Sequence, residues 1–341
     1  MIKILALIVV VLTVITIARI IRILELVSKL SPENEVETAK KDNKFNAVMM
    51  LLFLVFGMAG AVFTIVTLRH SMLPVSASEH GVAIDNLMNT TYAVIGIVFV
   101  ITHVFLFWYA YKYQFKKDKK ALFYPENHRL ELIWTIIPTI VLTCLIVYGL
   151  KTWNKIMDKA SPDAMVIQIY AKQFDWTVRY AGKDNVLGKS NFRLIKGANI
   201  LGMDSTDKNG FDDIITKELH FPVGKPILLK FNSRDVIHSA YLPHFRVQMN
   251  LVPGMTTRFG FTPTITTEKM KKITKNPKFE YVLLCNKICG IAHYTMKMNV
   301  VVESETEYNE WLSKQSPYYA APVPAADSTA KKPVAMVEVK K

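Results

Sequence analysis

Four apolar stretches in the first half of the chain constrain its fold more than any other feature. They cover residues 4–18, 46–68, 92–111 and 132–150, in a chain of 341 residues of which 51% are hydrophobic. The last three each have about the length that a hydrocarbon core of ~30 Å requires of a helix, whereas the first is short for a span. We therefore predict a membrane-anchored protein in which N-terminal transmembrane helices precede a soluble domain.

Basic residues in the loops predict the direction in which the helices run. Segments 19–45 and 112–131 each carry six lysine or arginine residues, whereas segment 69–91 carries only Arg69. By the positive-inside rule the two basic segments are cytoplasmic, and four crossings place the chain after residue 151 outside the cytoplasm. We predict an extra N-terminal region, residues 1–70, with helices at 4–18 and 46–68. A transmembrane hairpin follows in residues 71–155, with helices at 92–111 and 132–150.

The first apolar stretch has an alternative interpretation as a cleaved signal peptide. Lys3 followed by an apolar segment fits a signal, but Arg19 and Arg22 come next, where a signal would have a small-x-small cleavage site. Cleavage would leave three spans and would place the C-terminal domain in the cytoplasm. We therefore prefer a retained first helix.

The second half of the chain has the pattern of a β domain. From about residue 164 the sequence consists of short alternating or apolar stretches separated by Gly, Pro, Asn and Asp. We predict a small antiparallel sandwich or barrel over residues 160–315. Residues 182–213 are polar and Gly-rich and are expected to form a long surface loop. Residues 316–341 have too little apolar surface to fold alone, so we expect a disordered tail there.

The C-terminal part of this domain contains a concentrated set of soft metal ligands, Cys285-x3-Cys289-x3-His293-x2-Met296. Thiolate, thioether and imidazole ligands favour copper or zinc, and the methionine argues against a structural zinc site. A mononuclear blue-copper site uses one cysteine, so one thiolate is in excess, whereas two thiolates could bridge two copper ions. Such a site needs a second histidine. His238 is the candidate, because it follows an apolar strand and precedes a Pro-containing turn.

The alternative is that these residues hold no metal. A histidine at a strand end is commonly a hydrogen-bonded surface group, and two cysteines in a reducing compartment can be inert thiols. Outside the cytoplasm, however, two thiols this close would oxidise to a disulfide unless a metal held them. The chain has three cysteines and no C-x-x-C-H motif, so neither a disulfide framework nor an attached c-type haem is expected.

Three stretches of the sequence carry a resemblance to a known family. They are NHRLELIWTIIPTIVL at 127–142, DVIHSAYLP with VPGMTTRF within 235–259, and CNKICGIAHYTM at 285–296. In this order they are similar to the start of the second transmembrane helix and to the two copper loops of subunit II of cytochrome c oxidase. The resemblance covers roughly residues 92–312. It implies a cupredoxin-like β-barrel or sandwich on the periplasmic side of a bacterial inner membrane.

The resemblance also implies a binuclear copper A centre. Its ligands, carried over by position, are the bridging Cys285 and Cys289, the capping His238 and His293, the weak ligand Met296 and the backbone carbonyl of Lys287.

Lys287 departs from the family pattern, which usually has a glutamate that binds a magnesium ion at the border with subunit I. An ammonium group has no lone pair and cannot bind a cation. Asn250 stands where the family often has aspartate, and Gln248 where it often has lysine. We therefore expect magnesium to be absent or held by subunit I alone, with Lys287 supplying positive charge nearby.

The electron entrance departs from the family as well. Relatives accept the electron through an exposed Trp in an aromatic stretch, and the matching residues here are Phe174, at the entrance position, and Trp176. Both could equally be ordinary residues of the β domain. Residues 151–315 contain 24 Lys and Arg against 16 Asp and Glu. Because complementary charge speeds the encounter of redox partners, we expect an acidic cytochrome or a haem subunit held in a larger assembly, rather than a strongly basic soluble cytochrome.

Two ionisable residues lie in or next to the predicted transmembrane helices, Glu131 just before 132–150 and His103 within 92–111. Glu131 matches the family's glutamate at the entrance of the proton channel that feeds subunit I, and a carboxylate facing lipid there would be costly. The alternative is an acid that the helix dipole favours at a helix start. His103 has no family counterpart, and we expect it to make an interhelical hydrogen bond rather than to bind a metal.

We interpret the chain as the copper-containing subunit II of a bacterial cytochrome c oxidase. It would pass electrons from a periplasmic c-type cytochrome to haem a of subunit I, where oxygen reduction is coupled to proton pumping. The expected partners are subunits I and III, the cytochrome and membrane lipid; despite the net charge of +14, no nucleic acid is expected.

Three alternatives are weaker. A copper-free quinol-oxidase subunit would not need the full ligand set. A membrane-tethered copper-delivery or reductase protein should lack the helix start at 127–142. A nitrous-oxide reductase should have a second, His-rich copper domain, which eight scattered histidines do not supply.

Overall fold

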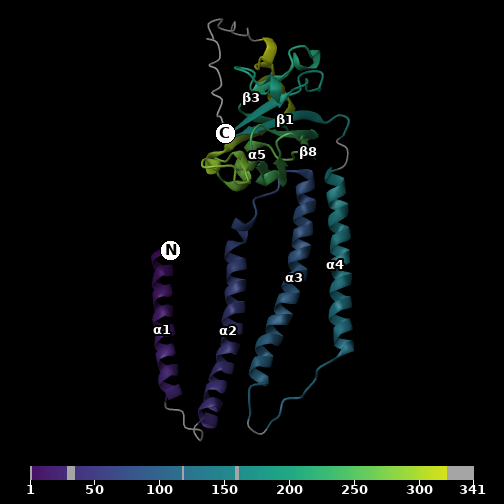
Figure 1. Ribbon diagram of the computed structural model, residues 1–341. Coiled ribbons are helices and arrows are strands. Elements are labelled where there is room, and N and C mark those ends of the chain that lie inside the picture. Colours follow the sequence, from purple (N-terminus) through teal and green to yellow (C-terminus); the bar gives the residue numbers. More distant parts are fainter. Residues whose placement is uncertain (1, 29–34, 117–118, 158–160, 321–341) are drawn as a thin grey trace, which may run out of the picture. The chain divides into compact units, whose positions relative to one another are not determined.

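The computed structural model describes residues 2–28, 35–116, 119–157 and 161–320. Four helices come first in the chain and are followed by ten β-strands in the described residues (Figure 1). The helices are α1 (Ile2–Ser28), α2 (Glu35–Met72), α3 (Glu79–Lys112) and α4 (His128–Met157). The chain divides into two compact units, one formed by Met1–Met72 with Thr91–Thr139 and the other by Leu73–Thr90 with Ile140–Lys341.

Within the described residues, three helical segments are long and apolar enough to cross a membrane: Lys41–Arg69, Glu79–Lys112 and His128–Met157. In lipid every backbone N–H and C=O must be bonded within the segment, which a helix achieves. The predicted spans at 46–68, 92–111 and 132–150 lie inside these three. The first apolar stretch, 4–18, lies in α1, which is helical but is not among the three. That α1 crosses the membrane stays a prediction.

Two polar side chains near or within α3 and α4 bond to the backbone of their own helix or its first turn. The Asn127 side chain accepts a hydrogen bond from the N–H of Leu130, at 3.1 Å, and so caps the start of α4. His103 Nδ1 lies 2.8 Å from the carbonyl oxygen of Phe99, one turn earlier in α3. The structure thus gives His103 a hydrogen bond within its own helix, where we predicted an interhelical one, because its ring can reach the carbonyl one turn earlier.

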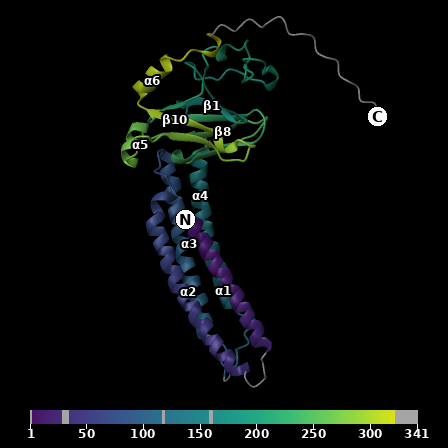
Figure 2. The ribbon, with the colours of Figure 1, turned by 90° about the vertical axis from the view of Figure 1, so that its left-hand side faces the viewer.

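The β domain consists of two five-stranded sheets. The first has the order β3-β2-β1-β5-β8 and the second the order β4-β10-β9-β6-β7. Figure 2 shows the short helices α5 (Thr267–Thr274) and α6 (Glu305–Ser313) outside the sheets. The strands are β1 (Met165–Lys172), β2 (Asp175–Tyr180), β3 (Ile214–Thr216), β4 (Leu219–Pro222), β5 (Ile227–Ser233), β6 (His238–Leu242), β7 (Val247–Leu251), β8 (Thr257–Phe261), β9 (Tyr281–Cys285) and β10 (Lys297–Glu303).

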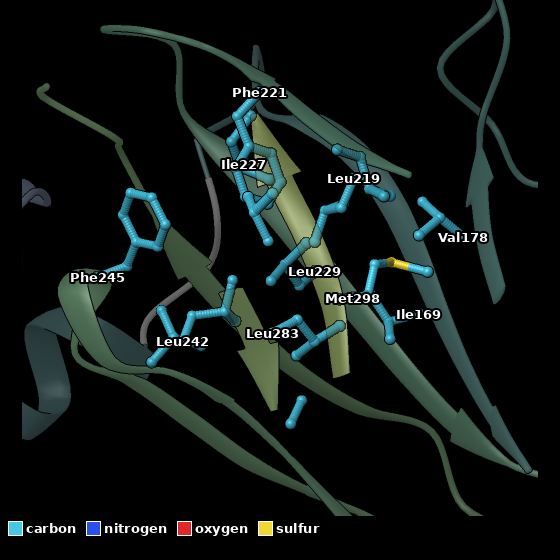
Figure 3. Packing of buried hydrophobic residues seen from close by; sticks show 14 of the residues in the cluster. Ile169, Val178, Leu219, Phe221, Ile227, Leu229, Leu242, Phe245, Leu283 and Met298 are labelled. Carbon is cyan, nitrogen blue, oxygen red and sulfur yellow. The ribbon is translucent and has the colours of Figure 1, made fainter. Parts of the chain in front are cut away.

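Alternating apolar residues form the core between the two sheets (Figure 3). In β5 every second residue is buried, which places Ile227 and Leu229 on the inner face. Leu283 of β9 and Phe221 of β4 come from the other sheet and are also fully buried. This period of two is what a strand with one buried face requires, and it confirms the predicted two-sheet β domain behind N-terminal helices.

The prediction that all strands pair antiparallel is wrong in two places. β1 pairs with β5 in parallel, and β10 pairs with β4 in parallel. Parallel neighbours require a long connection, and residues 173–226 and 223–296 provide it. Alternation in the sequence indicates which face of a strand is buried but not the direction of its neighbour, so this feature could not be read from the pattern.

The predicted loop 182–213 is fixed to the first sheet by a buried ion pair. Arg179 of β2 pairs with Asp213, and both side chains are almost fully buried. The same guanidinium donates to the Gly188 carbonyl at 2.7 Å, and the N–H of Gly188 donates back to Asp213 at 3.1 Å. The loop is therefore an ordered part of the domain.

The first residues of the predicted disordered tail, 316–341, are bonded to the β domain. The backbone N–H of Tyr318 donates to the Asp213 carbonyl at 2.8 Å, and the hydroxyl of Tyr319 donates to the Met203 carbonyl at 3.2 Å. The two tyrosine rings supply apolar surface that can pack on the loop. The prediction missed this because it was based on the average composition of residues 316–341, which is rich in Ala and Pro. Residues 321–341 lie outside the described residues.

Arg246 joins the start of α3 and the segment before it to the β domain. Its guanidinium donates to both carboxylate oxygens of Asp85, at 2.8 and 2.9 Å, and to the carbonyl of Pro74, at 2.6 Å. The Arg246 side chain is 7% exposed, so these charge-assisted bonds are largely shielded from water.

His244, beside this junction, predicts a dependence of stability on pH. Its ring packs edge-on against Phe279 and Tyr281, and Nδ1 is buried without a hydrogen-bond partner among the described residues. Burial, with a smaller contribution from Arg246, lowers the pKa of His244 from 6.5 to about 4. The unfolded chain therefore binds a proton between pH 6.5 and 4 that the folded chain does not. This contribution to the free energy of unfolding is present above pH 6.5 and is lost as the pH falls to 4, by at most about 3 kcal/mol.

We expect His244→Phe to reduce the loss of thermal stability between pH 7 and pH 5, measured as the unfolding temperature of the full-length protein in detergent. His128→Gln, at a side chain that is 81% exposed, is the control and should follow the wild type. An unchanged pH slope in His244→Phe would contradict this assignment.

Candidate metal centre

His238 is held in place by the turn that precedes it. It is the first residue of β6 and is fully buried. Its Nε2 lies 2.9 Å from Oδ1 of Asp235, which also accepts the N–H of Val236 at 2.7 Å. Since Nε2 is engaged by the carboxylate, Nδ1 is the nitrogen available to a metal. Nδ1 lies 3.8 Å from Sγ of Cys285.

The other candidate ligands come from one loop between β9 and β10. Cys285 ends β9, and its N–H donates to the carbonyl of Met296 at 3.1 Å. The pairing of Leu284 with Lys297 continues this ladder, so the loop leaves and returns at adjacent positions of the second sheet. Cys289 and Met296 are buried beneath the loop, at 5% and 2% exposure.

The donor atoms lie in contact with one another. Sγ of Cys285 is 3.8 Å from Sγ of Cys289. Cys289 Sγ is 3.6 Å from Nδ1 of His293 and 3.9 Å from Sδ of Met296. On the other side, Cys285 Sγ is 3.2 Å from the carbonyl oxygen of Lys287. The structure thus brings together all six residues that the sequence predicts as ligands.

This arrangement fits a soft metal. Two ligands in tetrahedral positions around an ion, with bonds of ~2.0–2.3 Å, lie about 3.5 Å apart, which is close to the observed spacings. The ligand atoms of His238, Cys285 and Cys289 all lie within 4.8 Å of one another. Thiolate, imidazole and thioether are the donors that copper prefers. The third cysteine, Cys144, is exposed on α4 and is not part of this group.

The protonation of the ligand thiols couples metal binding to pH. Burial, together with the hydrogen bond and the charge of Cys285, raises the pKa of the Cys289 thiol to about 11. The free thiol is protonated at neutral pH, so metal binding must displace the proton.

The two aromatic residues predicted at the electron entrance differ in exposure. Trp176 is 1% exposed; its indole N–H donates to the Met296 carbonyl at 3.3 Å, and its ring centroid is 6.2 Å from that of His238. It therefore lies beneath the ligands, where a soluble donor cannot touch it. Phe174 is half-buried and lies against Gly290 of the ligand loop.

Glu131 belongs to the other compact unit. It lies in the first turn of α4, where its side chain is 49% exposed and Oε2 is 3.2 Å from Nδ1 of His128. The carboxylate therefore has a partner within the first turn of its own helix.

Sequence reasoning missed two residues that support the ligands. Asp235 precedes His238 by three residues, and this spacing in a turn was a usable signal for a carboxylate that orients the imidazole. Gln173 donates from its side chain to the Cys289 carbonyl at 2.6 Å, across 116 positions of sequence. No local pattern indicates that contact.

The fold and the site define a membrane-anchored protein with a cupredoxin-like, two-sheet domain that carries a candidate metal centre. Residues 64–152 match the transmembrane domain of cytochrome c oxidase subunit II, and residues 165–305 match its periplasmic domain. The alternative cytochrome c oxidase subunit 2 of Bradyrhizobium diazoefficiens is 32% identical over 237 residues, covering 69% of this chain and 81% of that protein. The cytochrome c oxidase subunit 2 of Thermostichus vulcanus is 25% identical over 300 residues, covering 78% and 86%.

A solved structure, the periplasmic domain of subunit II of cytochrome oxidase from Bradyrhizobium japonicum, is 23% identical. It covers 46% of this chain and 95% of that chain, with a TM-score of 0.31, so the assignment rests on the sequence matches. The chain belongs to the cytochrome c oxidase subunit II family. It is a subunit of a haem–copper oxidase, with its β domain in the periplasm.

The position of Asp235 predicts a loss of metal affinity when its carboxylate is removed. We expect Asp235→Ala to weaken copper binding by the full-length chain about 10- to 100-fold, because His238 loses the group that orients its ring. Competition with a copper chelator measures this. Asp175→Ala removes a carboxylate that pairs with Lys217 and should bind copper like the wild type. Equal affinities in both variants would contradict the role of Asp235.

Proposed function

We propose that the metal centre is a binuclear copper A site. The observation that carries this proposal is the division of the donor set into two matched halves. The Cys285 sulfur has one imidazole, from His238, and one weak oxygen donor, from Lys287. The Cys289 sulfur has one imidazole, from His293, and one weak thioether donor, from Met296. A mononuclear site would leave half of these groups without a purpose.

In this proposal Cys285, Cys289, His238 and His293 would hold the two copper ions as their strong ligands. Met296 and the Lys287 carbonyl are the weak ligands. Since only the main chain of Lys287 takes part, its exposed ammonium group is free. It cannot bind magnesium; any magnesium in the complex would be held by subunit I.

The function that follows is electron relay without bond chemistry in this chain. Bound copper would supply a one-electron redox couple. The protein supplies a fixed ligand frame, in which β9, β10 and β6 set the positions of the donor atoms and the surrounding hydrogen bonds tune the potential. We infer that the chain accepts electrons from a periplasmic c-type cytochrome and passes them to haem a of subunit I, in a complex that also contains subunit III.

The surface of the ligand loop supports contact with partner proteins. Ile288, Ile291 and Tyr294 are 86%, 93% and 86% exposed. These three exposed, largely apolar side chains lie in one segment of seven residues, 288–294, which also contains the ligands Cys289 and His293. Such a group is unusual for a water-facing loop and is typical of a protein interface. The excess of basic over acidic residues in 151–315 favours a donor that is acidic or is held within a larger assembly.

The roles of Phe174, Trp176 and Glu131 are part of the same proposal. Phe174 reaches the surface beside the ligand loop and would be the first group that the electron meets. Trp176 would act from beneath, through its hydrogen bond to the Met296 carbonyl. Glu131 would take up protons at the cytoplasmic start of α4 for the channel in subunit I.

Copper content and low-temperature electron paramagnetic resonance of the purified full-length chain test the central proposal. We expect two copper ions per chain and a seven-line hyperfine pattern, because one unpaired electron is shared equally by two bridged ions. Cys289→Ser should lose this pattern. A single copper ion with four lines, or zinc in place of copper, would overturn the proposal.

Substitution of Phe174 tests the electron entrance separately. In the assembled oxidase we expect Phe174→Ala to slow electron transfer from the cytochrome at least tenfold while the copper spectrum stays unchanged. Phe192→Ala removes another exposed phenyl group, 75% exposed, from the loop 182–213, and should leave the rate unaffected. Equal rates in the two variants would move the entrance away from Phe174.

A further inference from the structure

The two ligand loops of the metal centre belong to distant parts of the sequence. His238 follows β5, whereas the cysteines, His293 and Met296 lie between β9 and β10. β6 and β9 are paired at Ala240 with Cys285 and at Tyr241 with Leu284, and the N–H of Asn286 continues this contact by donating to the carbonyl of Ser239 at 2.9 Å. This pairing ends at the metal centre, so further contacts must fix how the His238 turn sits against the rest of the cysteine loop.

Gln173, in the turn between β1 and β2, makes contact with both loops. Its backbone N–H donates to Oδ2 of Asp235 at 2.7 Å, and the other oxygen of the same carboxylate is bonded to His238. Its side-chain Nε2 donates to the carbonyl of Cys289 at 2.6 Å. One residue from the first sheet thus ties the two ligand loops of the second sheet together.

The ligand loop is shaped to receive this residue. A Cβ atom on Gly290 would lie 2.8 Å from Nε2 of Gln173 and 2.8 Å from two ring carbons of Phe174. Real Cβ atoms do not approach neighbours so closely, and Gly290 also has a φ of +144°, which L side chains rarely adopt. The absence of a side chain at Gly290 lets the 173–174 turn lie directly on the backbone beside Cys289.

We propose that Gln173 is a positioning residue for the metal centre. It clamps the Asp235–His238 turn to the Cys289 loop and so fixes the spacing between the first imidazole and the two sulfur atoms. The inference rests on the proposed copper site and adds a residue that does not touch the metal. Electron sharing between two bridged ions depends on equivalent surroundings, so loosening one loop against the other should change the hyperfine pattern as well as the affinity.

Gln173 is exposed, which makes it accessible to a clean test because its removal opens no cavity in the core. Gln173→Ala deletes the bond to the Cys289 carbonyl and keeps the backbone bond to Asp235. Gln173→Glu keeps the length of the side chain but turns a carboxylate toward the carbonyl. Gln315→Ala is the matched control, because Gln315 Nε2 also donates to a backbone carbonyl, that of Trp311, remote from the ligands.

The experiment is copper chelator competition and low-temperature electron paramagnetic resonance on the full-length chains in detergent. We expect Gln173→Ala and Gln173→Glu to bind copper about 10- to 100-fold more weakly, the range found for groups that orient metal ligands. Their seven-line pattern should be distorted toward unequal ions. Gln315→Ala should match the wild type in both measurements, and the copper-free unfolding temperatures of all variants should agree.

A double substitution separates a clamp from a purely local contact. In Asp235→Ala the clamp has already lost its hold on the His238 turn, so adding Gln173→Ala should cost less copper affinity than it costs the wild type. Fully additive losses would show that Gln173 supports the cysteine loop alone and would overturn the clamp.

The remaining outcomes are also decisive. Affinity and spectrum equal to the wild type in Gln173→Ala would overturn the inference and leave the proposed function standing. A lowered copper-free unfolding temperature in Gln173→Ala would assign it a general structural role instead. A wild-type chain that fails to bind two copper ions would remove the proposed function, and the inference with it.

Discussion

Two sulfur atoms 3.8 Å apart, on Cys285 and Cys289, are the constraint on which the metal centre depends. In an oxidising compartment two such thiols form a disulfide or bind a metal, and as thiolates without a cation they would repel each other. The β9–β10 ladder brings the chain back on itself at Met296 and so fixes the length of the loop. The sheet therefore holds the two sulfur atoms at a spacing that suits a shared metal site.

The residues around the two cysteines support the ligands through a set of hydrogen bonds. Asp235 orients His238, Gln173 joins Asp235 to the Cys289 carbonyl, and Trp176 supports the Met296 carbonyl from beneath. These hydrogen bonds come from the first sheet or from the turn before β6, whereas most ligands belong to the second sheet. The cupredoxin-like sandwich thus uses its two layers for different purposes, one to carry ligands and the other to hold them in place. A rigid frame of this kind suits an electron relay, in which the ligands should move little when the charge changes.

Much of the fold followed from the sequence because the signals were local. Apolar stretches of sufficient length predicted three of the spanning helices, and alternation predicted strands that the structure confirms, as in β5. Strand direction was not local. The parallel pairs β1–β5 and β4–β10 depend on connections of many residues, and the packing of Tyr318 and Tyr319 on residues 198–213 depends on a partner more than one hundred positions away.

The sequence by itself determined the chemistry of the candidate site, since Cys285, Cys289, His293 and Met296 lie within one loop and their donor types select a soft metal. It also indicated His238, through the apolar strand before it and the Pro-containing turn after it. Only the tertiary structure decided that Trp176 is buried beneath the ligands and that Gln173 and Gly290 bring a turn of the first sheet onto the ligand loop. The physical reason is that ligand identity is a property of side chains, which the sequence states directly. Ligand spacing and support are set by contacts between segments whose distance in space no local pattern contains.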